Sequence, residues 1–391
     1  MLPNLSVYIL GNYRPGMADG LAEFNFQNVN ALKDSIDFHF VEFDDSVEIG
    51  FYDSSTIDQI RIHRFGSKGF LALKLSGEFK RWLSELTVKN SVFHLNHIYN
   101  FNNYLVARLL VHYKIPYLIT PHDAYVYCKV FRSNRPLVKR LYRDLFVYFI
   151  DKYVFDHASY IHALTNQCIP CLRLLTSRPI MAVGNQVKDM HLTLDMNIME
   201  DRICFIGRSD IYQKGIDRVL AGFSLFVKSQ NVASSISLTI VGPADPESDQ
   251  LRQELCRDLE LEIGRQVVFA GKVQEVERNR ILSISKVYIH LSRFEGFGLS
   301  VIQALSAFKP VIVSKQVPTS DVIRDYKAGI VVDSLTEIAD AIAFIFALSD
   351  QEYLQMARNA RRCYEEQFHP DVIRPKLLDL YQRAASVADT K

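Results

Sequence analysis

The feature that most constrains the fold of this 391-residue chain is an alternation of short apolar runs with longer helical patterns. The first series of strand-like runs covers residues 6–10, 37–43, 60–64, 91–95, 117–120 and 160–164. The second series covers residues 203–207, 237–241, 267–270, 286–291, 310–314 and 329–332. Helical patterns, such as residues 79–88 and 102–112, separate the runs. Strands that alternate with helices pair in parallel and are covered on both faces, so the sequence predicts an α/β protein.

The length favours two domains, because a single hydrophobic core rarely extends over so long a chain. The two series are separated near residues 184–200. We therefore expect a first domain at residues 1–184 and a second at residues 185–370. The last segment, residues 371–391, is expected to carry a helix at about 375–384, with Pro375 in its first turn.

Composition excludes several classes of function. The formal net charge of +1 gives no global sign of nucleic-acid binding. Among six cysteines, Cys168 and Cys171 have CxxC spacing, but no second pair completes a zinc site. No apolar window reaches the roughly 18 residues that a membrane-spanning helix needs. No basic leader precedes the first apolar run, so the cytoplasm is the expected location.

Residues 294–314, FEGFGLSVIQALSAFKPVIVS, carry the most specific local pattern. Two glycines between a strand and a helix let the backbone approach a ligand, and free N–H groups at the helix start favour an anion. Glu295 lies just before this helix, where a bound phosphate would repel it and sugar hydroxyls would suit it. The pattern indicates either a nucleotide-sugar site or a helix start whose acid complements the dipole.

Two cations follow the first strand of the second series. Arg208 and Lys214 both lie between the strand at 203–207 and the helix after it. Loops that follow parallel strands share one edge of the sheet, so these cations can converge with the glycine turn at 296–298. Together they suit a diphosphate and would stabilise charge on a departing nucleoside diphosphate. The chain has no Asp-x-Asp pair, so a metal ion is not indicated.

Histidines follow two strands of the first series. His94 and His97 lie at the end of the strand at 91–95, and His122 with Asp123 directly follows the strand at 117–120. Ligands of open α/β sheets bind beyond the carboxyl ends of the strands, so a histidine there is well placed for function. The alternative is a loop histidine that caps backbone groups.

A basic segment with interleaved aromatic residues occupies residues 125–155. Its cations are Lys129, Arg132, Arg135, Lys139, Arg140 and Arg143. Such a helix can lie on an anionic membrane, so residues 129–143 are a candidate for peripheral contact. The alternative is a solvated helix whose apolar side packs on its own domain.

These motifs resemble those of the retaining glycosyltransferases of the GT-B fold, in the family 4 group (glycosyl transferases group 1). The likeness rests on FIGR…KGID at residues 205–217, on the 294–314 segment, and on VPTSDVI and AGIVV after it. In the first half, TPHDAY, KRLYRDL and YIHALTNQ keep the family's order. The resemblance implies two Rossmann-like α/β domains whose parallel sheets face each other across a cleft, with the C-terminal helix crossing back to the first domain. It also implies that the first domain binds the acceptor and the second binds the nucleotide-sugar.

The resemblance further implies roles for individual residues. Arg208 and Lys214 would bind the diphosphate, and Glu295 would bind hydroxyls of the donor sugar. His122 would lie near the transferred sugar. The donor would be cradled by Gly296, Phe297, Gly298 and Leu299. No cofactor and no metal are expected beyond the nucleotide-sugar itself.

Two positions depart from the family's pattern. Gln303 replaces the second glutamate of the signature, which in the family binds the nucleotide ribose. The first glycine loop has Asp19-Gly20 where the family has a glycine pair. We expect weaker or altered nucleotide binding from these changes.

The expected function is that of a cytoplasmic, metal-independent hexosyltransferase. If residues 129–143 contact the membrane, the protein would be peripheral at the inner face of the plasma membrane. It would move a hexose from a nucleoside-diphosphate sugar to a hydroxyl of a glycan or lipid-linked acceptor with retention of configuration, as in bacterial surface polysaccharide synthesis. The alternative is a non-catalytic GT-B subunit that binds nucleotide-sugar or scaffolds a partner enzyme. A Rossmann-type dehydrogenase is disfavoured, because neither series opens with GxGxxG.

Overall fold

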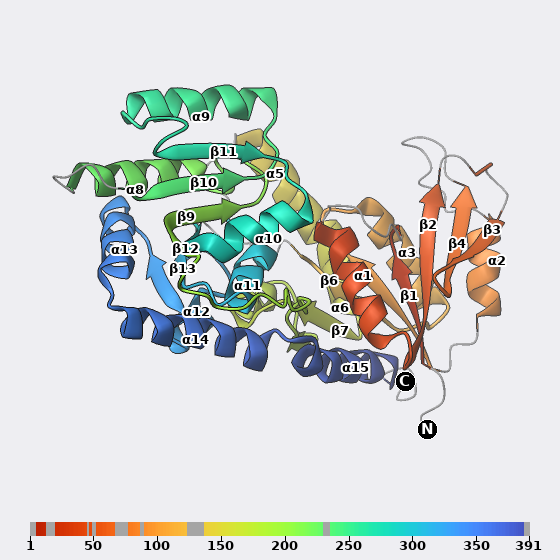
Figure 1. Cartoon of the computed structure of the whole chain (residues 1–391). Helices are drawn as coiled ribbons and strands as arrows, with labels where there is room; N and C mark the ends of the chain where they lie inside the picture. The colour runs from red at the N-terminus through yellow and green to blue at the C-terminus, as the bar shows by residue number, and fades with distance from the viewer. Residues whose placement is uncertain are drawn as a thin grey trace. The chain divides into compact units, whose positions relative to one another are not determined.

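The computed structural model describes residues 5–12, 20–44, 47–48, 52–66, 77–86, 90–122, 137–229 and 235–386. The chain divides into two compact units (Figure 1). Unit 1 comprises Met1–Gln186 and Ile373–Lys391, and unit 2 comprises Val187–Val372. Each unit is built on a sheet of mainly parallel strands, which confirms the predicted α/β class.

The sheet of unit 1 has eight strands in the order β3-β4-β2-β1-β5-β6-β7-β8. The strands are β1 (Leu5–Leu10), β2 (Ile36–Asp44), β3 (Tyr52–Ile57), β4 (Ile60–Gly66), β5 (Ser91–Asn96), β6 (Tyr117–Thr120), β7 (Tyr160–Ala163) and β8 (Ile180–Ala182). All neighbours pair in parallel except β3 and β4, which form an antiparallel hairpin. The sequence did not predict β3, because this edge strand is mostly polar and exposed. Its two-residue turn, Asp58–Gln59, has positive φ at both positions, as tight hairpin turns require.

The helices of unit 1 alternate with these strands. They are α1 (Gly20–Leu32), α2 (Gly77–Glu85), α3 (Phe101–His112), α5 (Leu137–Phe146), the π-helical turn η2 (Val147–Asp151), α6 (Lys152–His157), η3 (Asn166–Cys168) and α7 (Ile169–Arg173). The N-terminus of α3 is capped by the Asn100 side chain, which accepts from the amide of Asn102 at 2.9 Å.

The C-terminal helix, α15 (Pro370–Ser386), packs on unit 1, as predicted. Its buried face includes Leu377, Leu380 and Tyr381 and joins the core formed by β1 and β2. The predicted start of this helix at Pro375 is wrong. The helix begins at Pro370, whose missing N–H costs nothing in a first turn, and Pro375 lies inside the helix.

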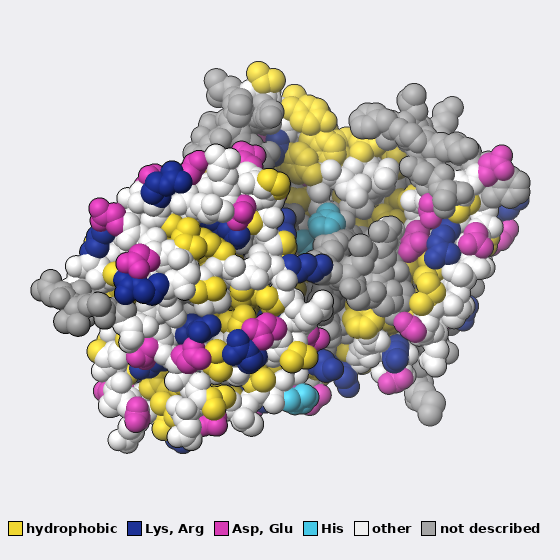
Figure 2. Space-filling model, turned by 45° about the horizontal axis from the view of Figure 1, so that its top comes forward, with side chains coloured by type: hydrophobic (Ala, Val, Ile, Leu, Met, Phe, Trp, Pro, Cys, Tyr) yellow, Lys and Arg dark blue, Asp and Glu magenta, His cyan; other side chains and the backbone are white. Residues whose placement is uncertain are grey.

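The helical stretch formed by α5 and η2 exposes an apolar stripe instead of burying it. The side chains of Val138, Leu141, Tyr142, Leu145, Tyr148 and Phe149 are 48% to 80% exposed and recur at helical spacing. Figure 2 shows hydrophobic side chains gathered at the top of the view. Of the expected surface cations, Arg143 is instead buried at 6% exposure. Lys129, Arg132 and Arg135, and the side chains of Lys139 and Arg140, lie outside the described part of the chain.

The sheet of unit 2 has six parallel strands in the order β11-β10-β9-β12-β13-β14. The strands are β9 (Glu200–Ile206), β10 (Ser237–Val241), β11 (Val267–Gly271), β12 (Ser285–His290), β13 (Val311–Ser314) and β14 (Gly329–Val332). The helices are α8 (Ile216–Ser229), α9 (Pro246–Asp258), α10 (Glu275–Ile284), α11 (Leu299–Ser306), α12 (Ser320–Asp325), α13 (Leu335–Ala347) and α14 (Asp350–Gln367). This is the doubly wound order, in which the direction of winding reverses between β9 and β12.

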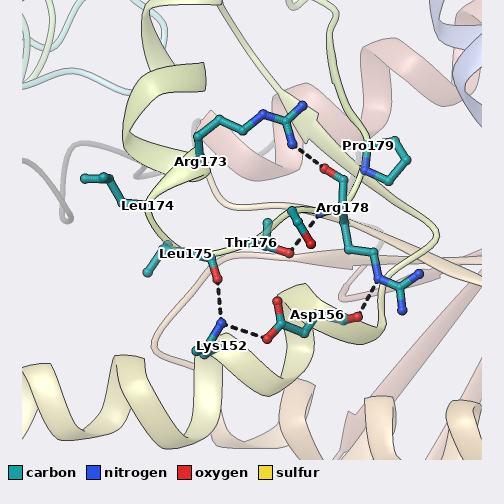
Figure 3. A pocket seen from close by; sticks show the side chains of 9 residues that line it. Lys152, Asp156, Arg173, Leu174, Leu175, Thr176, Arg178 and Pro179 are labelled. Atoms are coloured by element: carbon teal, nitrogen blue, oxygen red, sulfur yellow. Dashed lines mark hydrogen bonds and ion pairs between the residues drawn. The ribbon is translucent and has the colours of Figure 1, made fainter.

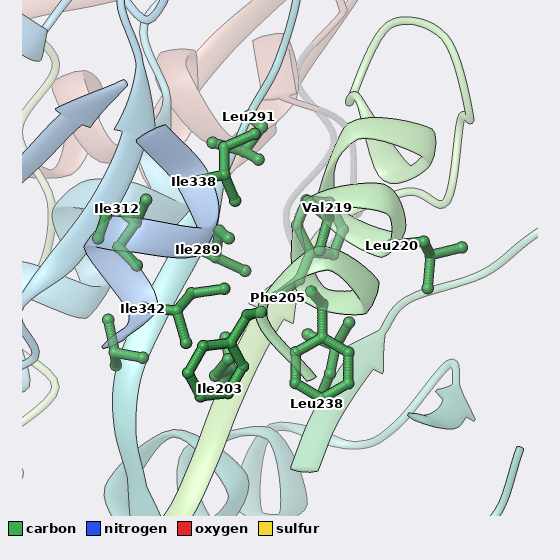
Figure 4. Close-up of a cluster of buried hydrophobic side chains, with 14 of the residues drawn as sticks. Ile203, Phe205, Val219, Leu220, Leu238, Ile289, Leu291, Ile312, Ile338 and Ile342 are labelled. Carbon is green, nitrogen blue, oxygen red and sulfur yellow. The ribbon is translucent and has the colours of Figure 1, made fainter. Parts of the chain in front are cut away.

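Strand residues of unit 2 pack against helices α8 and α13 to form a hydrophobic core (Figure 4). The core includes Ile203, Phe205, Leu238, Ile289 and Ile312 from strands, Val219 and Leu220 from α8, and Ile338 and Ile342 from α13. The two helices approach closely at Gly222, where an added Cβ would lie 2.3 Å from Ile338 Cγ2. This packing fixes the start of α8 relative to the strands.

Candidate functional site

The switch point between β9 and β12 brings two loops together. The strands are direct neighbours, with Cys204 paired to Tyr288. The loop after β9, residues 207–215, and the loop after β12, residues 291–298, therefore leave the same edge of the sheet side by side. Open α/β sheets bind ligands at such a point, so we take these two loops as the core of the candidate site.

The loop after β9 carries both predicted cations. Arg208 is exposed and makes no hydrogen bond or ion pair with the residues that the structure describes. Asp210 shapes the rest of the loop, since its carboxylate accepts from the amide of Gln213 at 2.6 Å and its carbonyl from the amide of Lys214 at 3.1 Å. Gly215 has φ +68, and an added Cβ would lie 2.1 Å from the carbonyl oxygen of Leu291. Only glycine allows the two loops to approach this closely.

Arg293 braces the two loops. Its guanidinium donates to both carboxylate oxygens of Asp217, at 2.8 and 2.6 Å, and lies 4.5 Å from the ring centroid of Tyr212. Its backbone amide donates to the carbonyl of Gln213 at 2.9 Å. Sequence reasoning did not select Arg293, although a cation next to the glycine turn was the available signal.

Glu295 and Lys214 are in direct contact. Lys214 Nζ lies 2.6 Å from Glu295 Oε2, and each side chain is 13% exposed. The same oxygen accepts from His290 Nε2 at 3.0 Å and from the Ser292 hydroxyl at 3.1 Å. Glu295 Oε1 has no hydrogen-bond partner among the described residues. One carboxylate oxygen is thus held by the protein, and the other is available to a ligand.

The surroundings of Glu295 keep its carboxyl ionised. Burial alone would raise its pKa, but the hydrogen bond from His290 and the positive charge of Lys214 outweigh burial and hold the pKa well below its usual range. Burial lowers the pKa of His290 despite the neighbouring carboxylate, so this imidazole is neutral near pH 7. A fixed carboxylate beside an ammonium group suits a ligand that carries both hydroxyls and negative charge.

The amino terminus of α11 opens the same site. Its N-cap is Gly298, with φ 89, and no side chain caps the helix. The amides of Leu299 and the residues beside it are therefore available to an anion. Phe297 is buried and packs edge-on against Phe368, with ring centroids 5.9 Å apart. Gln303 is half-buried on α11, and its side chain has no partner among the described residues.

Unit 1 carries the remaining predicted residues. His122 follows β6, with φ 51, and its Nε2 lies 2.9 Å from Asn96 Oδ1. Burial lowers the pKa of His122 well below its usual value, and the nearby His97 lowers it further, so the ring is neutral and Nε2 donates to Asn96. Gly20 is the first residue of α1. Residues 13–19, with Asp19, and Asp123 lie outside the described residues.

Comparison with known proteins finds a family similarity in the second half of the chain. Residues 195–363 match the family model "Glycosyl transferases group 1". This segment is therefore similar to the glycosyl transferases group 1. A curated relative from Xenopus tropicalis, "GDP-Man:Man(3)GlcNAc(2)-PP-Dol alpha-1,2-mannosyltransferase", is 24% identical over 178 residues, which are 44% of this chain and 37% of the relative. The chain spans less than half of the length of each curated relative that it matches.

Solved structures show the fold of the whole chain. A sucrose-phosphate synthase from Thermosynechococcus elongatus matches with a TM-score of 0.72 and 17% identity, over 98% of this chain and 100% of that chain. Anabaena HepE, solved in complex with UDP and glucose, matches with a TM-score of 0.70 and 14% identity, over 97% and 100%. The fold is that of the GT-B glycosyltransferases.

The segment that matches the family model contains the cluster around Glu295, of which sequence reasoning found only part. Glu295 and Lys214 were predicted, but their direct pairing was not. His290 and Ser292 were missed, because a histidine that ends a buried strand reads equally well as a core residue. The available signal was that Ser292 and Glu295 follow His290, the last residue of β12, by two and five residues, which places all three at the same strand end.

A separate polar pocket in unit 1 is not part of this site. It lies between α6 and the segment before β8, and its charged lining includes Lys152, Asp156, Arg173 and Arg178 (Figure 3). These groups bond to each other and to backbone carbonyls, as Lys152 does to Asp156 at 2.8 Å and to the carbonyl of Leu175 at 3.0 Å. The pocket adjoins the amino end of β8, whereas ligands of such sheets bind at carboxyl ends.

Two further sequence expectations concern metal and membrane. Cys168 and Cys171 are both free thiols. Within the described ranges, no group of three or more His, Cys, Asp or Glu side chains is arranged to hold a metal ion. In the same ranges, every helix is too short or too polar to span a bilayer.

Proposed function

We propose that the chain transfers a hexose from a nucleoside-diphosphate sugar to a hydroxyl of a glycan or lipid-linked acceptor, with retention of configuration. The observation that carries the proposal is the meeting of three features at the β9–β12 switch point. These are the cations Arg208 and Lys214, the uncapped amino terminus of α11, and the half-satisfied carboxylate of Glu295. Cations and amides suit a diphosphate, and the carboxylate suits the hydroxyls of a sugar.

Each group has a role in this reaction. The acceptor oxygen attacks the anomeric carbon of the donor, the bond from that carbon to the phosphate oxygen breaks, and the nucleoside diphosphate leaves with the electron pair and takes up the acceptor proton. Arg208, Lys214 and the first amides of α11 stabilise the charge that grows on the leaving phosphate, so the reaction needs no metal. Glu295 orients the sugar through Oε1, and Gln303 contacts the ribose. His122, neutral and fixed by Asn96, supplies a polar contact to the transferred sugar.

The acceptor is proposed to be lipid-linked, as in the assembly of bacterial surface polysaccharides. One support is the name of the Xenopus relative, which gives a PP-Dol-linked saccharide as its acceptor. The other is the apolar stripe on α5 and η2, defined by residues 138–149. A soluble helix normally turns such a stripe inward, because exposed apolar side chains gain nothing from water.

The occupant of the stripe is proposed to be the interface of an anionic membrane. Tyr142, Tyr148 and Phe149 have the amphipathic or aromatic character that suits the headgroup level of a bilayer. The adjoining sequence, residues 129–140, contributes five cations and no acidic residue, which complements anionic lipid. The helical stretch formed by α5 and η2 is anchored to Tyr99 of the same unit. Asp151 accepts from the amide of Tyr99 at 3.2 Å, and the Phe146 ring stacks on the Tyr99 ring with centroids 5.0 Å apart.

Vesicle sedimentation tests the membrane contact. Replacing Tyr142 and Phe149 by serine is expected to weaken binding to vesicles containing phosphatidylglycerol by roughly tenfold for each side chain. Leu174→Ser is the matched control, because this side chain is 79% exposed in the same unit but outside the stripe. Equal binding of all three proteins would exclude the stripe as the membrane surface. If the variant loses binding equally to vesicles with and without phosphatidylglycerol, insertion of apolar side chains alone would account for membrane binding.

Transfer and donor hydrolysis test the reaction. The full chain is incubated with UDP-glucose, GDP-mannose or ADP-glucose, with and without polyprenyl-diphosphate saccharides, and released nucleoside diphosphate is measured. Arg208→Ala is expected to lower turnover by about two orders of magnitude, since it removes a contact made to developing charge. Donor binding with neither hydrolysis nor transfer would favour the rival function, a non-catalytic nucleotide-sugar-binding subunit. No binding of any donor would overturn both functions.

A further inference from the structure

We infer that His290 is a positioning residue, which fixes the Glu295 carboxylate so that one oxygen, Oε1, meets the donor sugar. The inference rests on the proposed function and adds a residue to it. His290 is the last residue of β12, and its Nε2 lies 3.0 Å from Glu295 Oε2. Because a carboxylate oxygen can only accept, Nε2 carries the proton of this hydrogen bond.

The hydrogen bonds around His290 allow one orientation of the ring. Its other nitrogen, Nδ1, lies 3.2 Å from the hydroxyl of Tyr288. That hydroxyl also lies 2.8 Å from Ser300 Oγ, at the start of α11, and 3.1 Å from the carbonyl oxygen of Ile206, at the end of β9. A flipped ring would place Cε1 where Nε2 lies and Cδ2 where Nδ1 lies, so both hydrogen bonds would be lost. The network therefore links both strand ends and the helix start to the orientation of one imidazole.

Packing holds the ring in the same place. His290 is 1% exposed, and its ring stacks on Phe205 with centroids 5.6 Å apart and planes 9° apart. The Tyr288 ring, 6.1 Å away, is also nearly parallel to it. A ring enclosed in this way does not follow changes in the loops that surround it.

His290 is a fixed hydrogen-bond donor to Glu295, whereas Lys214 is flexible and would be shared between Glu295 and a bound diphosphate. A lysine has a long side chain with many rotamers, and a bound diphosphate would compete with Glu295 for its ammonium group. His290 and Ser292 cannot reach away from Glu295 in this manner, because they lie on or next to β12. When Lys214 turns to the diphosphate, they keep Oε2 occupied and Oε1 directed at the sugar. His290 thus contributes to recognition of the sugar and not of the nucleotide.

The test compares donors with and without their sugar. Dissociation constants of the full chain are measured for UDP-glucose, GDP-mannose and ADP-glucose and for UDP, GDP and ADP. His290→Leu is expected to weaken binding of the intact nucleotide-sugar by roughly tenfold, the effect of losing one hydrogen bond to a charged group, while binding of the nucleoside diphosphate stays unchanged. His290→Gln, which keeps an N–H donor, is expected to recover most of the loss. His191→Leu, at an exposed position of the same unit, is the control.

A double-mutant cycle separates a positioning role from a merely structural one. If His290 acts through Glu295, His290→Leu has no further effect on sugar binding once Glu295→Ala is present. Equal weakening of nucleotide-sugar and nucleoside diphosphate, or additive losses in the double variant, would overturn the inference. Wild-type protein that binds none of the six probes would instead overturn the proposed function, so the two failures are distinguishable.

Discussion

A chain of buried hydrogen bonds, the histidine relay, joins α15 to three strands of unit 1. His162 Nε2 donates to the carbonyl of Val183 at 2.8 Å, so Nδ1 accepts from the Thr120 hydroxyl at 2.7 Å. Thr120 Oγ1 accepts from His94 Nε2 at 2.7 Å, and His94 Nδ1 accepts from the Tyr381 hydroxyl at 2.9 Å. Every donor has an acceptor only while both imidazoles are neutral, so the relay predicts that stability depends on pH.

The size of this effect follows from the pKa of His162, which burial lowers from 6.5 to about 4. Above pH 6.5 the imidazole is neutral in the folded and the unfolded chain, and its stabilising contribution is fully present. As the pH falls from 6.5 toward 4, only the unfolded chain takes up the proton, and stability is lost across that window. At pH 5 the loss is about 2 kcal/mol, and below pH 4 it levels off near 3.4 kcal/mol.

The assay uses Trp82, the one tryptophan of the sequence, which packs against the core of unit 1 and reports its unfolding by fluorescence. Urea unfolding at pH 7.5 and pH 5.0 compares the wild type with His162→Gln, which lacks the titrating group. The stability advantage of the wild type is expected to shrink by about 2 kcal/mol at the lower pH. His157→Gln removes an exposed histidine of the same unit as a control. An advantage that stays constant between the two pH values would refute the reasoning.

Three further predictions concern the candidate site. Arg293→Met is expected to weaken donor binding roughly tenfold in calorimetry, because the two loops lose the ion pair with Asp217 that holds them together. The control Arg324→Met, which removes an exposed ion pair, should leave the affinity unchanged. Asn96→Asp is expected to raise the pKa of His122, because a carboxylate would replace the amide that accepts its hydrogen bond. The acid limb of the plot of kcat against pH should then move to higher pH. A plot that does not move would show that the protonation state of His122 does not affect turnover. Gln303→Glu is expected to tighten nucleoside diphosphate binding by up to about tenfold through charge-assisted bonds to ribose, and equal affinity would remove Gln303 from the ribose site.

Much of the fold could be predicted from the sequence because its parallel strands are buried on both faces. Such strands read as nearly continuous apolar runs, as LSVYIL of β1 and VIVS of β13 do. Strand β3 has no such signal, because it is stabilised by pairing with β4 at a polar edge. The start of α15 was misplaced because Pro370 and Pro375 both suit a first turn in sequence.

The candidate site was predicted only as far as local patterns reach. Arg208, Lys214 and Glu295 follow strand ends, which a sequence can indicate. The contact of Lys214 with Glu295 depends on β9 and β12 being neighbours, and strand order is a property of the whole sheet. The same holds for the histidine relay, whose link from His94 to Tyr381 spans 287 positions of the chain.

The central claim is that a nucleoside-diphosphate sugar binds at the two loops of unit 2, residues 207–215 and 291–298. Hydrogen exchange of the full chain, measured by mass spectrometry with and without UDP-glucose, GDP-mannose and ADP-glucose, tests it most directly. We predict that one of these donors slows exchange in peptides that cover both loops and the first turn of α11, and that Arg208→Ala reduces this protection. Binding that leaves both loops unprotected, or protects only other parts of the chain, would contradict the claim.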